Sequence, residues 1–241
     1  MKRLLDIVVS FMGLLVVFPF LLLAAAMVWL RDFHSPFYIA DRVGRGGRKF
    51  RMVKLRTMTH RADASGVAST AGDDPRITSI GRLLRRFKLD ELPQLWNVLK
   101  GDMGLVGPRP NVEDETRLYT KEEQHLLDVR PGITDIASIV FADESDILKG
   151  CDNPDLTYNQ LIRPWKSRFG LLYVKHASFW LDVKLILITA LAMVCRRCSL
   201  FRIGQVVAAL GADAALCAVA RREAQLKPHP PPGSDVVVTA R

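Results

Sequence analysis

The sequence predicts a monotopic membrane protein with an α+β fold, made mostly of short helices with a small β-hairpin and attached by an N-terminal re-entrant helical hairpin. Three features support this: an uncharged apolar run from Ile7 to Leu30, two β-type segments around a glycine turn, and two short amphipathic helical patterns after residue 78. With 241 residues, 49% of them hydrophobic, the chain is long enough for one core of ordinary size.

The apolar run is long enough to cross a membrane, since its 24 residues at about 1.5 Å each reach ~36 Å, against a hydrocarbon core of about 30 Å. Pro19 lies in its middle, where it removes a helical hydrogen bond and bends the helix. Two basic residues precede the run, and residues 31–61 after it carry a net charge of +7. Because basic flanks stay in the cytoplasm, we favour a re-entrant helix at 1–34 with its hinge at Phe18 and Pro19. A single kinked span is the alternative.

The charge of the whole chain is +9, so its partner is expected to be anionic: a nucleic acid, a phospholipid surface or a phosphorylated substrate. The basic stretch at 31–61 follows the apolar run directly, which favours a surface that faces lipid headgroups. A charged face exposed only to water is the alternative.

Two β-type segments, Phe37 to Val43 and Phe50 to Leu55, flank a turn with three glycines and predict a β-hairpin. The basic residues around this turn would suit a phosphate, but no phosphate-loop or dinucleotide-binding glycine pattern is present. A glycine turn with solvated arginines is therefore the simpler interpretation.

Two amphipathic helices are expected next, because apolar residues recur there with helical spacing. Ser79 is the expected N-cap of the first, while Pro93 in the first turn and Gly101 beyond the end mark the limits of the second. The apolar positions are Ile80, Leu83, Leu84 and Phe87 in the first helix and Leu92, Leu95, Trp96 and Leu99 in the second. Asp90 and Glu91 therefore lie at the joint between two helices.

The remainder of the chain predicts further helices joined by irregular segments. We expect a polar helix at about 111–128, a short one at 143–149, an apolar one from Phe179 to Val194 and one at about 204–224. The apolar helix is short for a membrane span, so an interfacial or core position is expected. Prolines after residue 227 predict a disordered end.

Four cysteines lie late in the chain and lack the dense spacing of a secreted disulfide scaffold, which fits a reducing cytoplasm. Cys195 and Cys198 form a C-x-x-C pair, but no second pair or histidine cluster accompanies it, and it ends an apolar helix instead of beginning one. We therefore expect an unreactive pair beside the membrane, with zinc binding and redox chemistry as alternatives.

Asp90 and Glu91 are the main candidates for chemistry. Helix capping is the structural alternative, because carboxylates accept hydrogen bonds from the free N–H groups at a helix start. Four cations lie nearby in the sequence: Arg85, Arg86, Lys88 and Arg109. Carboxylates, cations and a helix N-terminus that can bind phosphate together indicate phosphoryl transfer, in which Mg²⁺ held by a carboxylate commonly neutralises charge. An Asp among cations is expected to stay ionised and to attack phosphorus.

An ordered set of motifs runs through residues 1–194. It comprises the basic start with its proline-broken apolar helix, Lys54-Leu55-Arg56-Thr57-Met58, Asp74-Pro75-Arg76-Ile77-Thr78, the run from Leu89 to Met103 that contains Asp90-Glu91, Gly107-Pro108-Arg109-Pro110, Arg130-Pro131-Gly132-Ile133-Thr134, Tyr173-Val174 and Asp182. This set closely resembles the small monotopic phosphoglycosyl transferases among the bacterial sugar transferases. Two positions depart from the family pattern, since Gly104 stands where Ser is common and His176 where Asn is frequent.

The resemblance implies transfer of a sugar 1-phosphate from a UDP-sugar to polyprenyl phosphate, commonly undecaprenyl phosphate, in two steps with Mg²⁺. Asp90 would attack the β-phosphorus and release UMP, and the lipid phosphate would then attack the aspartyl-phosphosugar. Asp90 is also the expected metal ligand, and Glu91 is the second carboxylate of the dyad, with a role in metal or proton handling. The expected substrate-binding residues are Lys54, Arg56, Arg85, Arg109 and Asp182.

The implied setting is the cytoplasmic face of a bacterial inner membrane, where the reaction would begin a surface glycan such as O-antigen or exopolysaccharide. The chain would then divide into a membrane helix at 1–34, a catalytic domain at 35–198 and a partly disordered extension at 199–241. The implied partners are UDP-sugar, polyprenyl phosphate and membrane lipids, with no nucleic acid; the identity of the sugar and homodimer formation are left open. Two rivals are a basic membrane-tethered binding module without catalysis and a glycosyltransferase that releases UDP.

Overall fold

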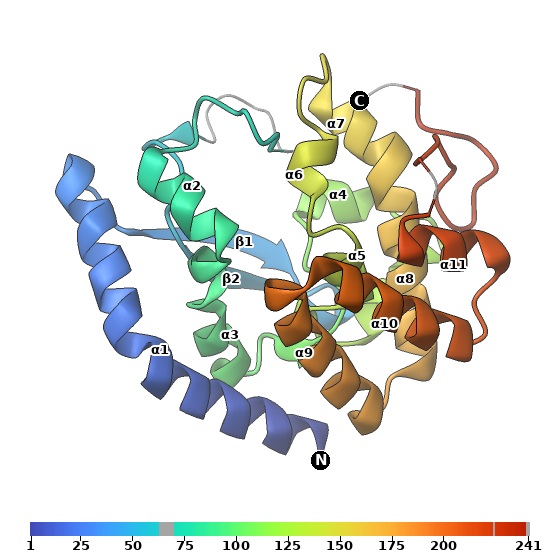
Figure 1. The fold of residues 1–241 in the computed structure, drawn as a ribbon, viewed down its shortest axis with the longest axis horizontal. Coiled ribbons are helices and arrows are strands. Elements are labelled where there is room, and N and C mark those ends of the chain that lie inside the picture. Colours follow the sequence, from blue (N-terminus) through green and yellow to red (C-terminus); the bar gives the residue numbers. More distant parts are fainter. Residues whose placement is uncertain (63–69, 224, 240–241) are drawn as a thin grey trace.

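The N-terminal helix dominates one side of the protein. The computed structural model describes residues 1–62, 70–223 and 225–239 and has α1 at Lys2–Asp32, a single helix that contains Pro19. In Figure 1, α1 bends midway but does not fold back on itself, so the expected re-entrant segment is one bent helix and not a hairpin of two helices. Within the described part of the chain, α1 is the one helix long and apolar enough to cross a membrane. Most of its apolar side chains are exposed, which is compatible with a membrane anchor.

The first turn of α1 is bonded to the body of the protein. The Lys2 ammonium lies 2.6 Å from the Asp182 carboxylate, and the Arg3 guanidinium donates to the carbonyls of Val98 and Leu99 at 2.5 and 2.7 Å. These carbonyls belong to the last turn of a helix, where intrahelical donors run out; the Val98 carbonyl also accepts the Gly101 N–H at 3.0 Å. The two basic residues at the chain start therefore have protein partners.

The predicted hairpin is confirmed. Strands β1 (Phe37–Val43) and β2 (Lys49–Leu55) pair antiparallel, and the turn between them places Gly46 and Gly47 at positive φ, which glycine adopts without steric cost. A second sheet was not predicted. In it, β3 (Gly104–Val106) pairs in parallel with β4 (Gly132–Thr134).

The two short amphipathic helices are also present, as α2 (Ser79–Arg86) and α3 (Gln94–Lys100). Between them lies the one-turn 3₁₀ helix η3 at Leu89–Glu91. Gly101 ends α3 with φ of 96°, as expected for a glycine beyond a helix end. The N-cap of α2 is Thr78 and not Ser79, because the Thr78 hydroxyl accepts the Gly81 N–H at 2.8 Å.

The predicted polar helix at 111–128 is two elements, α4 (Glu113–Arg117) and η4 (Glu123–Asp128). The chain breaks at Thr120, whose hydroxyl accepts the Glu123 N–H while the Glu123 carboxylate accepts the Thr120 N–H, both at 3.1 Å. This reciprocal capping box starts a new helical turn. The remaining elements are α5 (Ile136–Val140), α6 (Glu144–Ile147), α7 (Pro154–Thr157), η5 (Tyr158–Ile162), α8 (Arg163–His176), α9 (Phe179–Val194), α10 (Arg196–Ala209) and α11 (Ala214–Arg221).

The C-terminal extension is part of the main core. Ile203, Val207 and Ala220 are fully buried in the same apolar cluster that contains Phe169 and Leu185. The helix expected at 204–224 is thus two helices, and Figure 1 shows α10 and α11 packed over the side of the molecule formed by α5, α8 and α9.

Residues 225–239 contain no helix or strand, but they are bonded to the body. The Pro232 carbonyl accepts the Thr120 hydroxyl at 2.6 Å, and the His229 ring stacks on Trp165 with ring centroids 4.4 Å apart. A disordered end is therefore not what the structure gives across this range.

Candidate active site

Asp90 and Glu91 lie in the short turn η3, between α2 and α3. Lys88, directly before it, has φ of 56°, a left-handed conformation that costs a non-glycine residue on the order of 1 kcal/mol and here ends α2. The turn packs against β2, and only 8% of Asp90 is exposed. The predicted position of the pair at a joint between two helices is confirmed.

Glu91 is held by two cations from different parts of the chain. Arg109, in the turn after β3, bonds both carboxylate oxygens with its two terminal nitrogens, one of them at 3.3 Å, and the Lys54 ammonium of β2 lies 3.4 Å from Oε1. Burial alone would raise the pKa of Glu91, but the charges of Arg109 and Lys54 outweigh it and hold that pKa well below its usual range. Burial lowers the pKa of Lys54 to about 8, and the charge of Arg109 acts in the same direction.

Asp90 is the contrasting member of the pair. Its Oδ1 atom is buried and has no hydrogen-bond partner in the part of the chain that the structure describes. Burial raises the pKa of Asp90, the charge of Glu91 adds to this, and the charges of Lys54 and Arg85 act against it. The sequence led us to expect that the cations would determine the pKa of Asp90, but burial has the larger effect on it. A buried oxygen without a partner costs about 1–3 kcal/mol, which a bound ligand could offset.

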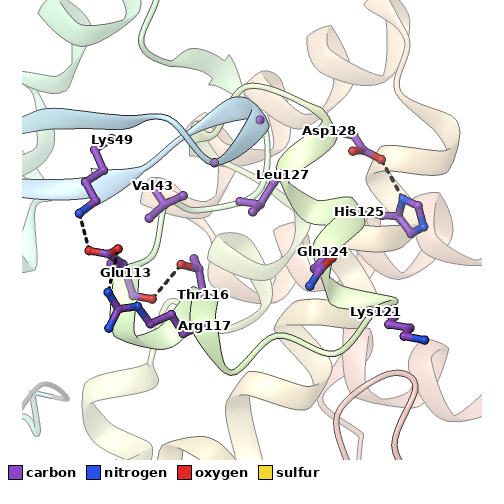
Figure 2. A pocket seen from close by; sticks show the side chains of 12 residues that line it. Val43, Lys49, Glu113, Thr116, Arg117, Lys121, Gln124, His125, Leu127 and Asp128 are labelled. Carbon is purple, nitrogen blue, oxygen red and sulfur yellow. Dashed lines mark hydrogen bonds and ion pairs between the residues drawn. The ribbon is translucent and has the colours of Figure 1, made fainter.

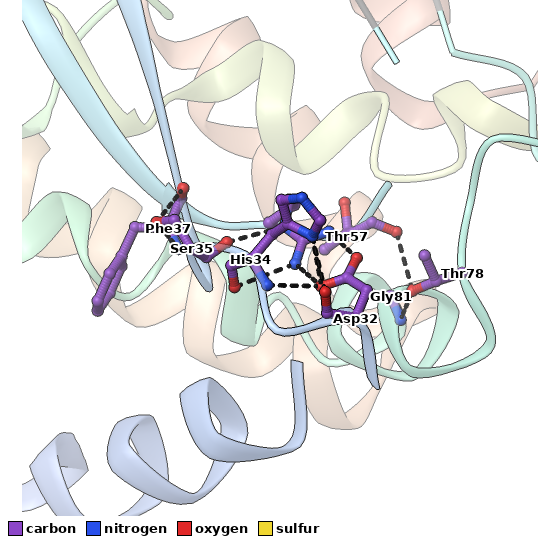
Figure 3. A network of polar contacts seen from close by, with 8 residues as sticks. Asp32, His34, Ser35, Phe37, Thr57, Thr78 and Gly81 are labelled. Atoms are coloured by element: carbon purple, nitrogen blue, oxygen red, sulfur yellow. Dashed lines mark hydrogen bonds and ion pairs between the residues drawn. The ribbon is translucent and has the colours of Figure 1, made fainter. Parts of the chain in front are cut away.

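Arg85 reaches the site from α2. Its Nε donates to the Thr57 hydroxyl at 2.9 Å, and burial lowers its pKa while the charge of Asp90 opposes this. Figure 3 shows how α2 is fixed: the Thr78 N–H and hydroxyl donate to the Thr57 carbonyl at 3.0 and 3.2 Å. Gly81 lies so close that a Cβ atom there would be 1.9 Å from the same carbonyl oxygen. Glycine therefore allows α2 to approach the end of β2 and to position Arg85.

Arg56, predicted to bind substrate, is engaged elsewhere. Its two terminal nitrogens each donate to one Asp32 oxygen at 2.6 Å, and its Nε donates to the Ser35 carbonyl at 2.8 Å. Figure 3 shows Asp32, His34 and Ser35 gathered in this network at the end of α1. The bond to Arg56 lowers the pKa of Asp32 below its usual range. Arg56 thus ties the end of α1 to the hairpin, and the structure does not bring it together with Asp90.

Asp182, also predicted to bind substrate, is buried with both oxygens occupied. Oδ1 accepts the Tyr173 hydroxyl at 2.6 Å and Oδ2 accepts the Lys2 ammonium at 2.6 Å. Its role in the structure is to hold the start of α1. The predicted hinge residues Phe18 and Pro19 lie inside α1, with Phe18 exposed.

A magnesium ion is compatible with Asp90 as its protein ligand. The described residues contain no cluster of three or more His, Cys, Asp or Glu side chains that could hold a metal. Mg²⁺, however, is often bound by one or two carboxylates, with water and substrate phosphates completing the shell. The unpartnered Oδ1 of Asp90 fits that arrangement, whereas both Glu91 oxygens are occupied by cations.

Two residues near the site were not predicted. Glu144 of α6 and Lys166 of α8 form an ion pair, and the charge of each acts on Arg109. Lys166 also lies 5.1 Å above the Tyr158 ring. The two residues are 22 positions apart, and the sequence did not predict α8. No sequence pattern therefore indicated that they pair.

A pocket of about 500 Å³ lies elsewhere, between the hairpin turn and η4 (Figure 2). In it, Glu113 accepts from Lys49 at 2.5 Å and from Arg117 at 3.0 Å, and His125 pairs with Asp128 at 2.9 Å. Neither Asp90 nor Glu91 lines this pocket, so it is separate from the candidate active site.

Comparison with known proteins gives a consistent result. The family model described as bacterial sugar transferase matches residues 1–196. The chain is 35% identical over 191 residues to the UDP-glucose:undecaprenyl-phosphate glucose-1-phosphate transferase of Caulobacter vibrioides, covering 78% of this chain and 67% of that relative. It is 38% identical over 153 residues to an exopolysaccharide production protein of Sinorhizobium fredii, covering 57% and 68%. It is 32% identical over 190 residues to the UDP-N-acetylgalactosamine-undecaprenyl-phosphate N-acetylgalactosaminephosphotransferase of Aeromonas hydrophila, covering 77% and 41%.

Proposed function

Because this chain belongs to the bacterial sugar transferase family, we propose that it transfers a sugar 1-phosphate from a UDP-sugar to undecaprenyl phosphate and releases UMP. Relatives that align over most of this chain carry that activity in their names, and one relative is named for exopolysaccharide production. The reaction would begin a bacterial surface glycan. The observation that carries the proposal is a buried carboxylate, Asp90, with an oxygen that has no hydrogen-bond partner among the described residues, beside a carboxylate held by two cations.

In the first step, an Asp90 oxygen attacks the β-phosphorus of the UDP-sugar. The new bond joins this oxygen to phosphorus, the bond between the β-phosphorus and the bridging oxygen breaks, and UMP leaves with that oxygen. In the second step, an oxygen of undecaprenyl phosphate attacks the same phosphorus and the Asp90 carboxylate is released. Mg²⁺ bound at Asp90 would neutralise charge on the diphosphate.

The cations of the site suit a diphosphate. Arg85, Lys54 and Arg109 come from α2, β2 and the turn after β3, and all three act electrostatically on the Asp90–Glu91 pair. They would favour binding of the diphosphate and stabilise the charge that develops on the leaving UMP. We assign Glu91 to positioning Arg109 and Lys54 instead of to proton transfer, because a carboxylate whose pKa lies well below its usual range is a weak proton acceptor.

The membrane arrangement is part of the proposal. The exposed apolar side chains of α1 and the basic residues at 31–61 support a re-entrant α1 in the inner membrane, with the active site on the cytoplasmic face. A single cysteine placed in a short extension before Met1 and another in place of Arg48 would test it. Both should react with an impermeant maleimide only from the cytoplasmic side. Labelling of the N-terminal cysteine only from the periplasm would require a spanning helix.

The test of the activity is nucleotide release over a panel of UDP-sugars with Mg²⁺ and undecaprenyl phosphate. UMP release by the wild type but not by Asp90→Asn is expected. Release of UDP would identify transfer of the sugar alone. No nucleotide release with any UDP-sugar, from protein that remains folded in membranes, would favour a basic binding module.

A further inference from the structure

Cys195 and Cys198, expected to be unreactive, are joined by a disulfide between α9 and α10, with their Cα atoms 5.3 Å apart. The side chain of Cys195 is partly buried and that of Cys198 is exposed. A small thiol can therefore approach the sulfur of Cys198 more easily than that of Cys195. In a reducing compartment, disulfides of this kind are usually transient and participate in catalysis or redox sensing.

The surroundings of the disulfide indicate which of its two sulfurs leaves when a thiol attacks. Cys195 is the N-cap residue of the 14-residue helix α10, and its sulfur accepts the Cys198 N–H at 3.3 Å. The two residues enclosed by the disulfide are Arg196 and Arg197. A helix N-terminus and a backbone donor both stabilise a thiolate, so Cys195 is suited to be the leaving group when Cys198 is attacked.

Arg196 connects this pair to the edge of the candidate active site. Its guanidinium donates to the carbonyls of Ile139 and Val140 and to the Asp143 carboxylate, the last at 2.9 Å. Asp143 directly precedes α6, and its carbonyl accepts the Ile147 N–H at 3.1 Å. The first residue of α6 is Glu144, whose charge acts on Arg109. The backbone of Arg196 is fixed because the disulfide closes the short ring that contains it.

We propose that Cys195 and Cys198 form a site of reversible thiol–disulfide exchange, specific for small thiols or a dithiol, and that its oxidised form holds α6 in place through Arg196. A thiolate attacks the Cys198 sulfur, the Cys195 sulfur leaves as a thiolate, and a mixed disulfide forms at Cys198. A second thiol then releases Cys198. Two external thiols are oxidised to one disulfide while the protein disulfide is reduced to two thiols.

Thiol trapping tests the chemistry in the full chain. Protein in native membranes is treated with oxidised glutathione or dithiothreitol, blocked with N-ethylmaleimide and weighed intact. The oxidised form should carry two maleimides, on Cys151 and Cys217, and the reduced form four. A return to two maleimides after reoxidation is expected. Four maleimides after oxidised glutathione would overturn the proposal.

Hydrogen exchange tests the link to α6. On reduction, backbone amides of α6 and of the first turn of α10 should exchange about tenfold faster, because closure of the ring no longer restrains Arg196. Cys198→Ser should behave like the reduced form under both conditions, whereas the matched control Cys217→Ser should respond like wild type.

Arg196→Gln separates the two parts of the proposal. It should still cycle between two and four thiols, but exchange of its α6 amides should no longer respond to reduction, because the remaining bond from Arg222 to Asp143, at 3.0 Å, does not depend on the disulfide. Equal exchange of α6 in oxidised and reduced wild type would overturn the link. Neither assay uses a sugar nucleotide, so their outcome is independent of the proposed transferase activity.

Discussion

Two buried carboxylates in this protein, Asp182 and Asp90, have opposite surroundings. Asp182 is 1% exposed and each of its oxygens accepts a short hydrogen bond, one from Tyr173 and one from Lys2. Asp90 is 8% exposed, and its Oδ1 has no partner within the described chain. A satisfied buried carboxylate stabilises the fold, whereas an unsatisfied one lowers stability unless a ligand completes it. The contrast therefore separates a structural acid from a candidate catalytic one, and the predictions below test it.

The largest effect is expected for Asp90→Asn. A neutral amide cannot displace UMP, so the covalent adduct should be absent and turnover should fall by roughly 10⁴-fold or more. Stability should not fall, because the substitution removes a buried charge whose Oδ1 has no hydrogen-bond partner in the described parts of the chain. Intact-protein mass spectrometry after mixing with UDP-sugar and Mg²⁺, without lipid phosphate, measures the adduct. An adduct that persists in Asp90→Asn would contradict the assignment of the nucleophile.

Glu91→Gln should have the next largest effect. The amide would leave Arg109 and Lys54 without the counter-charge that positions them, and turnover should fall by about 10²-fold while some adduct still forms. Single-turnover UMP release measures the first step of the reaction separately from the second. Loss of the adduct here together with its survival in Asp90→Asn would reverse the roles of the two residues.

Asp182→Asn should affect stability more than chemistry. It removes the charge that the partly exposed Lys2 pairs with, and should lower the free energy of unfolding by about 1–2 kcal/mol. Denaturant unfolding in detergent micelles measures this, with activity expressed per folded molecule. A loss of activity as large as that of Asp90→Asn in fully folded Asp182→Asn would show that both acids participate in chemistry and would remove the distinction between them.

A gain of stability is expected from Gly104→Ser. The Asp6 carboxylate of α1 accepts the Leu105 N–H with Oδ1, but its Oδ2 is buried and has no partner in the described residues. A Cβ atom at Gly104 would lie 3.4 Å from that oxygen, so a serine hydroxyl there is placed to donate to it. We expect the serine to raise the free energy of unfolding by about 1 kcal/mol, as measured by thermal unfolding. Gly104→Ala is the matched control, since it adds the carbon without the donor, and an equal gain from both would contradict the hydrogen bond.

The sequence predicted those helices and strands that a short-range residue pattern defines. The hairpin strands and the helix Phe179–Val194 were predicted almost to the residue, because alternation, a glycine turn and an unbroken apolar run are local signals. The helix α8 was missed because its inward side carries polar residues: Arg163 and Ser167 both bond Glu123. The three-residue strands β3 and β4 are too short to show a period and pair across 28 residues.

The same limit of local sequence patterns applies to the candidate site. Asp90, Glu91, Lys54, Arg85 and Arg109 were predicted and do act on one another. Arg56 and Asp182 carry charges of the same kind, and no local pattern shows that their partners lie 24 and 180 residues away. What a charged residue does in this protein is decided by contacts that only the fold creates.

The smallest effect is expected at the pair of the buried Arg56 and the partly exposed Asp32. The hydrogen bonds from Arg56 lower the pKa of Asp32 below its usual 3.8, so the ionised form is favoured in the folded protein. The contribution of the pair to stability is therefore complete above about pH 4 and is lost as the pH falls through the lower folded pKa. Because the Asp32 side chain is 27% exposed, water screens the pair in part and limits the effect. Wild type should melt about 1–2 °C above Arg56→Gln at pH 7, and the difference should shrink steadily toward pH 2. A difference that stays constant with pH would show that Arg56 acts through its bond to the Ser35 carbonyl, and the pair would then be no more than a surface contact.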